Sequence, residues 1–324
     1  MQSIVALQRI ISEALDKRTF PDNPISLYEP ISYFLGIGGK RLRPVLTLLA
    51  ADMFGAAIAE SLPAALAVEM FHNFTLMHDD IMDEAPLRRG RETIHTKWDV
   101  NTAILSGDAT LITAYQLLAE CKSTQLAELL KVFNKMAQEV CEGQQLDMDF
   151  EKLPTVSEGE YLHMIRLKTS VLLGAALEMG AILGQASAQD RANIYAFGVN
   201  MGIAFQLQDD ILDVYGDPLK FGKQVGGDII ENKKTYLLIN ALQLAKGDDK
   251  KELMQWIETT DFEQKRKIER VTAIFDKLGL QELANQKKIA FAKDAYRALD
   301  AIELAVEKKL PLIEFAQNLL TREH

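Results

Sequence analysis

Apolar residues recur at helical spacing along most of the chain. In residues 2–17, for example, Ile4, Leu7, Ile11 and Leu15 are three or four positions apart, as on the buried face of an α-helix. The same periodicity predicts long helices over residues 45–59, 62–83, 101–119, 124–141, 158–184 and 190–214, and helical structure from residue 236 to the end with a charged break at 246–252. Alternation typical of strands never persists beyond a few residues. The predicted fold class is therefore all-α.

Two segments interrupt the helical pattern. Residues 20–30 carry three prolines and predict a loop. Residues 142–160 (EGQQLDMDFEKLPTVSEGE), which contain Pro, Gly and many acidic residues, predict the clearest internal loop. No Pro-, Gly- or Ser-rich linker divides the chain, and 48% hydrophobic content is enough to fill one large core. We therefore predict a single domain over residues 1–324.

The composition excludes several classes of protein. A formal charge of −10 argues against a general nucleic-acid or anionic-membrane surface, although local Lys and Arg residues or metal ions can reverse the field in one cleft. Two cysteines, Cys121 and Cys141, provide neither a disulfide framework nor a zinc-site spacing. The N-terminal segment is charged throughout, and no stretch approaches eighteen uncharged apolar residues. We expect a soluble, cytoplasmic protein without stable membrane insertion.

The first candidate site is the acidic motif DDxxD formed by Asp79, Asp80 and Asp83 inside an apolar, helix-compatible run. Asp79 and Asp83 share one helical face, where like charges repel unless a cation lies between them. Mg²⁺ suits such hard oxygen ligands, because it takes one or two protein carboxylates and completes its shell from water and phosphate. Arg88 and Arg89 follow closely, and guanidinium groups match diphosphate oxygens. A solvated acidic helix end beside a basic turn would give the same local pattern.

A second copy of the motif favours the metal site over that alternative. Asp209, Asp210 and Asp213 repeat the spacing within FQLQDDILDVY at residues 205–215. Two acidic clusters embedded in otherwise apolar helices are hard to explain as two solvated faces. If they face each other across a cavity, they could hold several Mg²⁺ ions around one diphosphate.

Three basic segments complete the candidate chemistry. Lys40 and Arg43 follow Gly38 and Gly39 in GIGGKRLRP, where they can converge on one anion at a helix start, although a basic cap on a surface helix is the alternative. Lys168 lies among Leu, Val and Ala residues and is predicted to face a cavity rather than to snorkel to the surface. The Gly- and Lys-rich stretch after residue 215, with Lys223, Asp228 and Lys233, is a candidate lid or an ordinary mobile surface loop.

Taken together, these motifs resemble the trans-isoprenyl diphosphate synthase (polyprenyl synthetase) family. The matching segments are collinear over most of residues 35–240: GGKRLRP at 38–44, His72, RRGRETIH at 88–95, AILSGD at 103–108, KTS at 168–170, FQLQDDILD at 205–213, GKQVGGD at 222–228 and NKKTY at 232–236. Asp99 and Asn232 stand where many members have Gly.

The resemblance implies a large helical bundle around a deep central cavity, usually a homodimer, that condenses an allylic diphosphate (dimethylallyl, geranyl or farnesyl) head-to-tail with isopentenyl diphosphate. It implies Mg²⁺, expected as three ions with substrate bound, held by Asp79, Asp83 and Asp209 with Asp80, Asp210 and Asp213 nearby. The implied contacts of the allylic diphosphate are Arg88, Lys168, Lys223 and Lys233. Those of isopentenyl diphosphate are Lys40, Arg43, His72 and Arg89, and Thr169 and Gln206 lie near the developing carbocation.

Product length is expected to depend on Phe74, five residues before Asp79 and roughly 7.5 Å along the helix axis. The resemblance favours geranylgeranyl diphosphate, because Thr75 replaces the second aromatic residue typical of farnesyl synthases, with Phe71 as a deeper second floor. Farnesyl diphosphate is the alternative, followed by longer products.

Two further readings remain. A class I terpene cyclase also ionises a diphosphate at a DDxxD helix, but as the resemblance has it, cyclases lack the GGKRLRP segment and the second aspartate motif. A non-catalytic subunit of a heteromeric synthase would be expected to lose one acidic motif, whereas both are intact here.

Overall fold

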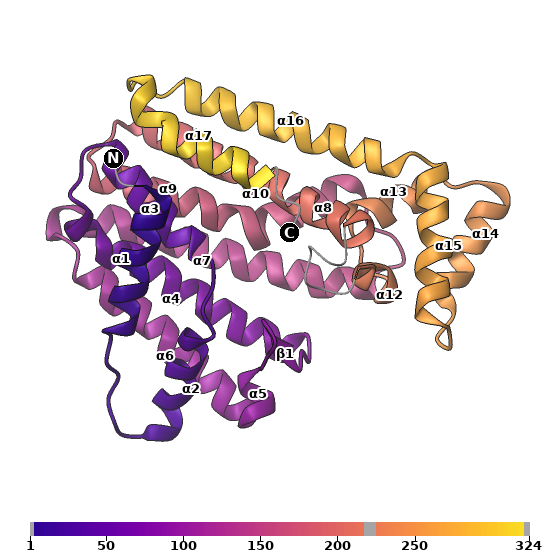
Figure 1. The fold of residues 1–324 in the computed structure, drawn as a ribbon, viewed down its shortest axis with the longest axis horizontal. Helices are drawn as coiled ribbons and strands as arrows, with labels where there is room; N and C mark the ends of the chain where they lie inside the picture. Colours follow the sequence, from indigo (N-terminus) through magenta and orange to yellow (C-terminus); the bar gives the residue numbers. More distant parts are fainter. Residues whose placement is uncertain (1–2, 217–224, 321–324) are drawn as a thin grey trace. The chain divides into compact units, whose positions relative to one another are not determined.

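The computed structural model describes residues 3–216 and 225–320, and its long elements are α-helices (Figure 1). The helices are α1 (Ile4–Asp16), α2 (Ile25–Gly36), α3 (Leu42–Met53), α4 (Ile58–Met82), α5 (Ile94–Lys97), α6 (Val100–Ala119), α7 (Ser123–Lys152), α8 (Glu158–Ile165), the π-helix η1 (Arg166–Ser170), α9 (Val171–Leu183), α10 (Ala188–Tyr215), α12 (Gly227–Ile230), α13 (Tyr236–Leu244), α14 (Gly247–Glu258), α15 (Gln264–Lys277), α16 (Leu280–Asp300) and α17 (Val306–Leu320). Strands β1 (Leu87–Arg88) and β2 (Arg91–Glu92) pair as an antiparallel hairpin. The predicted all-α fold class is confirmed.

Three local predictions were wrong. Helix α7 continues through most of the expected loop at 142–160 as far as Lys152, because the segment contains good helix formers and Pro154 is its first strong breaker. Helix α2 begins immediately after Pro24 and runs through the buried Pro30, one turn past its start, where the missing N–H costs only one hydrogen bond. The break expected at 246–252 comprises only residues 245–246, between α13 and α14, and Asp248 and Asp249 lie instead in the first turn of α14, at the positive end of the helix dipole.

The chain divides into two compact units. The first comprises Met1–Ala137, Ala175–Ala192 and Leu304–Leu312, and the second comprises Gln138–Gly174, Asn193–Glu303 and Ile313–His324. Helices α7, α9, α10 and α17 therefore contribute residues to both units. A single domain over residues 1–324 stays a prediction.

In the first unit, α4 packs most extensively against α6 and α3. An alanine-rich stretch of α4, from Ala64 to Met70, is buried on all sides, because small side chains allow neighbouring helices to approach closely. Nearer the C-terminal end of α4, Met77 packs in a cluster with Phe34, Ile94 and Ala103. These contacts fix the end of α4 that carries the first acidic motif.

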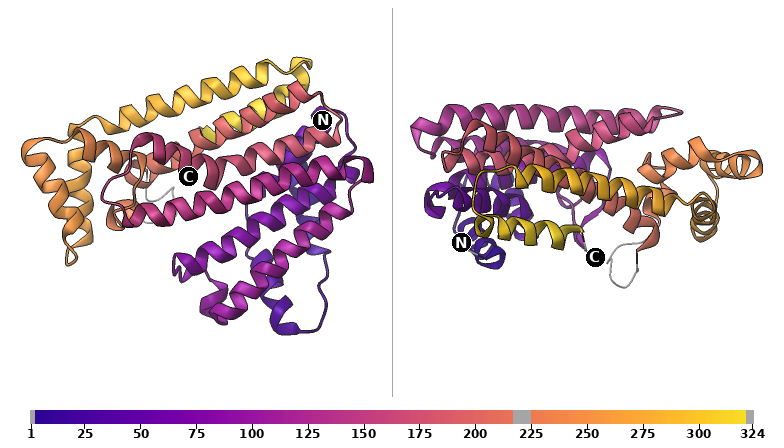
Figure 2. Two further views of the ribbon diagram at one scale, coloured as in Figure 1. Left: turned by 180° about the vertical axis from the view of Figure 1, so that it is seen from behind. Right: turned by 90° about the horizontal axis from the view of Figure 1, so that it is seen from above.

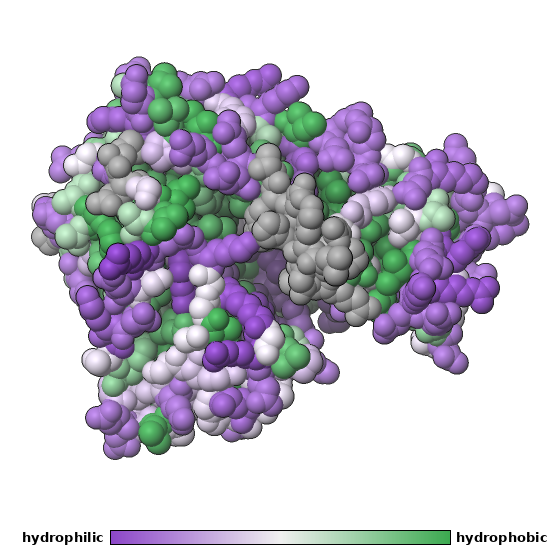
Figure 3. Space-filling view, in the orientation of Figure 1, coloured by the Kyte–Doolittle hydropathy of each residue, from purple (hydrophilic) through white to green (hydrophobic). Residues whose placement is uncertain are grey.

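In the second unit, α8, α10, α13 and α15 share one hydrophobic core. Helix α15 buries Val271, Ile274 and Phe275, which recur at helical spacing, and its other positions are mostly charged. The surface of α14 and α15 is correspondingly mostly hydrophilic (Figure 3), and α15 packs against α14 and α16 (Figure 2). Within residues 3–216 and 225–320, no helix is long and apolar enough to span a bilayer.

Candidate active site

The first acidic motif lies at the C-terminal end of α4, in the first unit. Asp80 is only 2% exposed, and the guanidinium of Arg88 donates to its carboxylate from Nε (2.8 and 2.9 Å) and from Nη2 (2.7 Å). Arg88 is presented by the β1–β2 hairpin, in which it pairs with Arg91. Asp79 is partly exposed and Asp83 is exposed at the end of the helix. Asp80 is thus anchored to the protein, whereas Asp79 and Asp83 are accessible.

The second acidic motif shows the same division in the second unit. Asp210 is 3% exposed and accepts hydrogen bonds from the Tyr161 hydroxyl, the Tyr236 N–H (3.0 Å) and the Gln206 amide (3.4 Å). Burial and the nearby charge of Asp228 raise the pKa of Asp210 to about 7. In both motifs the second aspartate is buried whereas the first and last are at least partly exposed, so the first and last aspartates are better placed for a ligand.

A cavity of about 320 Å³ opens beside the second motif. It is lined by residues of the second unit that the sequence singled out, namely Lys168, Thr169, Gln206, Asp209, Asp210, Asp213, Asp228 and Lys233, and by others that it did not, including Asp147 and Tyr161. Burial and the charge of Asp228 raise the pKa of Asp213 to about 6, although Asp213 accepts a hydrogen bond from the Asp228 N–H (3.0 Å). Carboxylates that repel one another beside lysines form a donor set that suits a divalent cation and its anionic ligand.

No group of three or more His, Cys, Asp or Glu side chains among the described residues is close enough to form a metal site by itself. The two acidic motifs belong to different units, and that they face each other stays a prediction. Lys223 lies outside the described residues.

Lys168 and Thr169 are carried by the π-helix η1. The Lys168 ammonium group donates to Asp147 Oδ2 (2.5 Å), and the Thr169 hydroxyl donates to Gln206 Oε1 (3.5 Å). Gly143 of α7 lies directly against the backbone of Lys168, where no Cβ would fit. A glycine at this position lets the two backbones come into contact, which explains why α7 contains a glycine within the helix.

The basic segment lies in the first unit, between α2 and α3. Arg43 Nη1 donates to His72 Nε2 (3.1 Å), and among the described residues Arg43 Nε has no hydrogen-bond partner although it is buried. Desolvation, together with Arg43 and other arginines, holds the pKa of His72 well below its usual range. His72 is therefore neutral and accepts from Arg43. The arginines that act on His72, of which Arg43 and Arg89 have the largest effect, lie near one another, and such a group of guanidinium ions is typical of an anion site.

Arg41 of the basic segment forms a buried ion pair with Glu69, which the sequence patterns did not predict. Asp147 was missed as well. Asp147 was assigned to the wrongly predicted loop. Glu69 did leave a signal, because a single acid within the apolar run AALAVEMF is expected to have a buried partner.

The residues expected to set product length also lie in the first unit. The Phe74 ring is 4.7 Å from the His78 ring and 5.7 Å from the Phe71 ring, measured between centroids. Phe71 in turn lies edge-on to Phe133 (5.4 Å). The Thr75 hydroxyl donates to the carbonyl of His72 (2.8 Å). Phe74 is thus packed within a row of rings on α4.

Comparisons with known proteins identify the family to which the chain belongs. The family model described as polyprenyl synthetase matches residues 24–275. The geranylgeranyl diphosphate synthase of Methanosarcina mazei is 37% identical over 316 residues, which cover 97% of this chain and 95% of that protein. A crystal structure of a geranylgeranyl pyrophosphate synthase superimposes with a TM-score of 0.95 at 46% identity, covering 100% of both chains. A decaprenyl diphosphate synthase from Rhodobacter capsulatus superimposes with a TM-score of 0.89 at 30% identity, covering 99% of this chain and 97% of that one. The chain therefore belongs to the polyprenyl synthetase family and is a trans-prenyltransferase with the helical fold of these synthases.

Proposed function

We propose that this enzyme condenses isopentenyl diphosphate head-to-tail with an allylic diphosphate and releases geranylgeranyl diphosphate. The proposal is supported by two chemically different groups of side chains that could each bind an anion. One is the carboxylate–lysine cavity of the second unit, suited to a metal-bound diphosphate, and the other is the group of Arg43 and His72 in the first unit. A prenyltransferase that joins two diphosphates needs two such sites.

Magnesium would be held by the accessible aspartates Asp79, Asp83, Asp209 and Asp213, with three ions expected when substrate is bound. Once bound, the ions would supply positive charge to the leaving diphosphate. Lys168 and Lys233 line the same cavity and offer fixed ammonium groups where negative charge develops. Arg88 and Lys223 are proposed as further contacts of this diphosphate.

The allylic cation formed by loss of diphosphate needs an environment that excludes water and offers oxygen dipoles. The hydroxyl of Thr169 and the amide of Gln206 lie at the cavity wall and are bonded to each other, so their oxygens are held in place. On α4, Phe71 and Met77 are buried and Phe74 and Leu76 are partly buried, and we assign these apolar residues to the wall that excludes water. The released diphosphate is the proposed acceptor of the final proton, since no side chain of the motifs is an evident base.

Isopentenyl diphosphate is assigned to Lys40, Arg43, His72 and Arg89. A neutral His72 suits this role, because a neutral imidazole can give one N–H to a phosphate oxygen while its other nitrogen accepts from Arg43. The unpaired Nε of Arg43 is a second donor for that anion. Product length is assigned to Phe74, whose ring is supported from behind by Phe71.

A homodimer is proposed from the surface of α6. Ile104, Leu105, Ile112 and Tyr115 are exposed on this helix, although they are large and apolar. A row of such residues on one helix is typical of a protein–protein interface.

The test of the proposed function is turnover of isopentenyl diphosphate with farnesyl, geranyl or dimethylallyl diphosphate, with Mg²⁺ or EDTA, and chromatography of the products. We expect geranylgeranyl diphosphate, no turnover in EDTA, and rates on the order of 10²-fold lower in Asp79→Ala and Asp209→Ala. A cyclic hydrocarbon formed without isopentenyl diphosphate would instead establish a terpene cyclase.

A further inference from the structure

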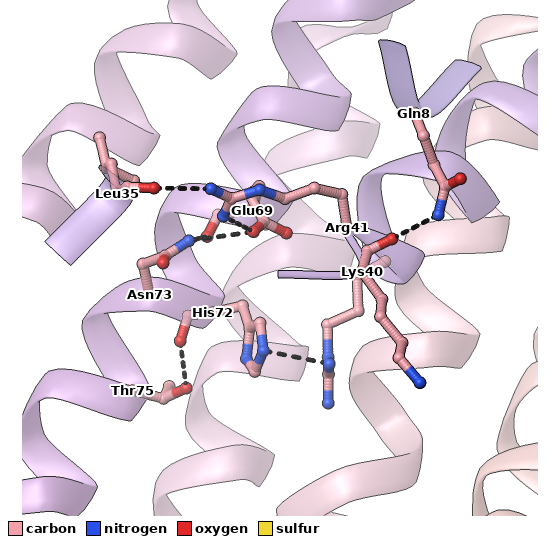
Figure 4. A network of polar contacts seen from close by, with 9 residues as sticks. Gln8, Leu35, Lys40, Arg41, Glu69, His72, Asn73 and Thr75 are labelled. Carbon is pink, nitrogen blue, oxygen red and sulfur yellow. Dashed lines mark hydrogen bonds and ion pairs between the residues drawn. The ribbon is translucent and has the colours of Figure 1, made fainter. Parts of the chain in front are cut away.

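Of the basic residues in the segment Gly38–Arg43, Arg41 has distinct surroundings. Its Nη1 lies 2.5 Å from Glu69 Oε1, and its Nη2 donates to the carbonyl of Leu35 (2.8 Å), the penultimate residue of α2 (Figure 4). The side chains of Arg41 and Glu69 are only 8% and 4% exposed. Lys40, by contrast, is exposed, and Figure 4 shows its ammonium group pointing away from this pair.

Glu69 is itself fixed on α4. The Asn73 amide, one turn further on, donates to the Glu69 carbonyl (2.7 Å) and to its carboxylate (3.2 Å). His72 projects from the same turn of α4 toward the basic segment, as Figure 4 shows. The pair therefore connects the end of α2, the loop before α3 and the part of α4 that carries His72.

The backbone of the loop explains why it needs such a connection. Gly38, Gly39 and Arg41 all have positive φ angles, of 82°, 152° and 48°. Glycine adopts this region freely, but a residue with a Cβ is sterically disfavoured there. Arg41 is also the N-cap of α3 and makes no side-chain capping bond. The ion pair with Glu69 and the bond to Leu35 hold the Arg41 side chain, and together with the bond from the Val45 N–H to the Arg41 carbonyl (3.3 Å) they stabilise this unfavourable backbone conformation.

That conformation sets the positions of the neighbouring cations. It directs the chain so that Lys40 precedes and Arg43 follows at the start of α3, with Arg43 directed at His72. It also brings Gly39 against Arg89, since a Cβ at Gly39 would lie 2.6 Å from Arg89 Nη1. The side chains assigned to isopentenyl diphosphate thus surround a loop whose shape depends on Arg41.

We propose that Arg41 and Glu69 are a positioning pair for the isopentenyl diphosphate site: neither contacts the substrate, and together they fix the loop that presents Lys40 and Arg43. This inference rests on the proposed function. Arg41 thus has a different role from Lys40 and Arg43 of the same motif, because its guanidinium already binds Glu69 and the carbonyl of Leu35.

The direction in which Glu69→Gln changes substrate binding distinguishes a positioning role of the pair from a purely electrostatic one. Glu69→Gln removes a negative charge near an anion site and releases Arg41. If charge alone mattered, or if Arg41 itself bound the diphosphate, this change would tighten substrate binding. If the pair fixes the loop, the same change weakens binding, although the site becomes more positive.

The experiment is steady-state kinetics of Glu69→Gln with isopentenyl and allylic diphosphates varied separately. We expect the KM for isopentenyl diphosphate to rise roughly tenfold or more, as for the loss of one hydrogen bond to a charged group. The KM for the allylic diphosphate and kcat are expected to change by less than about twofold. An unchanged or lower KM for isopentenyl diphosphate would overturn the proposal, as would an equal rise in both KM values.

Two further variants keep the test decisive. Glu60→Gln removes the same charge from the exposed start of α4, where Glu60 pairs with Lys122, and it should leave both KM values unchanged. If Glu69→Gln does not fold because Arg41 is left buried and unpaired, Arg41→Gln/Glu69→Gln removes both charges and should fold. Its KM for isopentenyl diphosphate is still expected to be raised, and a wild-type value would overturn the proposal. Failure of the wild-type enzyme to use isopentenyl diphosphate would instead refute the proposed function.

Discussion

Replacing Asp80 by asparagine should destabilise the protein, whereas the same change at the adjacent Asp79 should mainly slow the reaction. Asp80 is 2% exposed and receives three short contacts from Arg88, so Asp80→Asn leaves a guanidinium without its counter-ion. Breaking a buried ion pair costs about 3–5 kcal/mol. Because Arg88 remains 24% exposed and asparagine keeps one acceptor oxygen, we expect about 2–3 kcal/mol.

Asp79→Asn removes a partly exposed carboxylate at the accessible side of α4. Its effect on the free energy of unfolding should be clearly smaller than that of Asp80→Asn, because the Asp79 side chain is partly exposed. The rate should fall on the order of 10²-fold, because a charge that acts in the transition state is lost. Some loss of activity is also expected in Asp80→Asn, since Arg88 would no longer be held.

The assay is urea denaturation in EDTA, followed by far-UV circular dichroism, together with kcat in saturating Mg²⁺. EDTA removes any contribution of bound metal to stability. Equal denaturation midpoints for Asp79→Asn and Asp80→Asn would refute the argument that the second aspartate is a structural anchor. If Asp79→Asn were destabilised and Asp80→Asn were not, the first aspartate would be the structural anchor instead of the second.

Three further outcomes are expected. Arg43→Ala should chiefly raise the KM for isopentenyl diphosphate and Lys168→Ala should chiefly lower kcat, and equal effects of both changes on both substrates would contradict the assignment of two sites. Phe74→Ala should lengthen the products, as measured by chromatography, and an unchanged distribution of product lengths would mean that another residue limits the length. In EDTA the Asp210→Asn variant should gain stability relative to the wild type as pH rises from about 4 to about 7, measured as the difference between their urea midpoints. The folded wild type keeps the proton of Asp210, whose pKa is raised to about 7, after the unfolded chain has lost it, whereas the opposite effect of His72 is present in both proteins and cancels. A difference that stays constant with pH would contradict this prediction.

Hydrophobic periodicity was enough to predict the fold class and the positions of the long helices, but it failed where tertiary contacts decide. Gly143 and the acidic residues after it are typical of a loop, yet α7 continues through them. The good helix formers of this segment allow the helix to continue, and Gly143 stands within it because the backbone of Lys168 lies against it, a contact that no sequence pattern within one segment contains.

The site shows the same limit. By sequence, the three aspartates of each motif look equivalent. They differ in burial, which depends on other parts of the chain: Asp80 is buried beside Arg88, and Asp210 is buried beside Tyr161, 49 residues before it. The Arg41–Glu69 pair spans 28 residues and was missed for the same reason.

One departure from the family pattern has a structural explanation. Asn232 stands where many members have Gly, and its φ is 55°, in the left-handed region. Asparagine tolerates this region better than most residues with a Cβ. Its side-chain oxygen also accepts from the ammonium group of Lys267 (2.7 Å), so the substitution keeps the turn and adds a contact.

The π-helix η1 confines the effect of one extra residue to a single turn. A π turn contains about one residue more than an α turn, so the segment Arg166–Ser170 holds one residue more than a regular helix would need between α8 and α9. Because the wide turn absorbs this residue, α8 and α9 keep the rotation that they would have in an uninterrupted α-helix, in which one inserted residue would turn everything beyond it by about 100°. Deleting one residue here should therefore leave the buried faces of α8 and α9 in place and chiefly change the directions of the side chains within η1, including that of Lys168 beside Asp147. An alignment gap between residues 160 and 172 would then mark a change in the geometry of the site rather than in the fold.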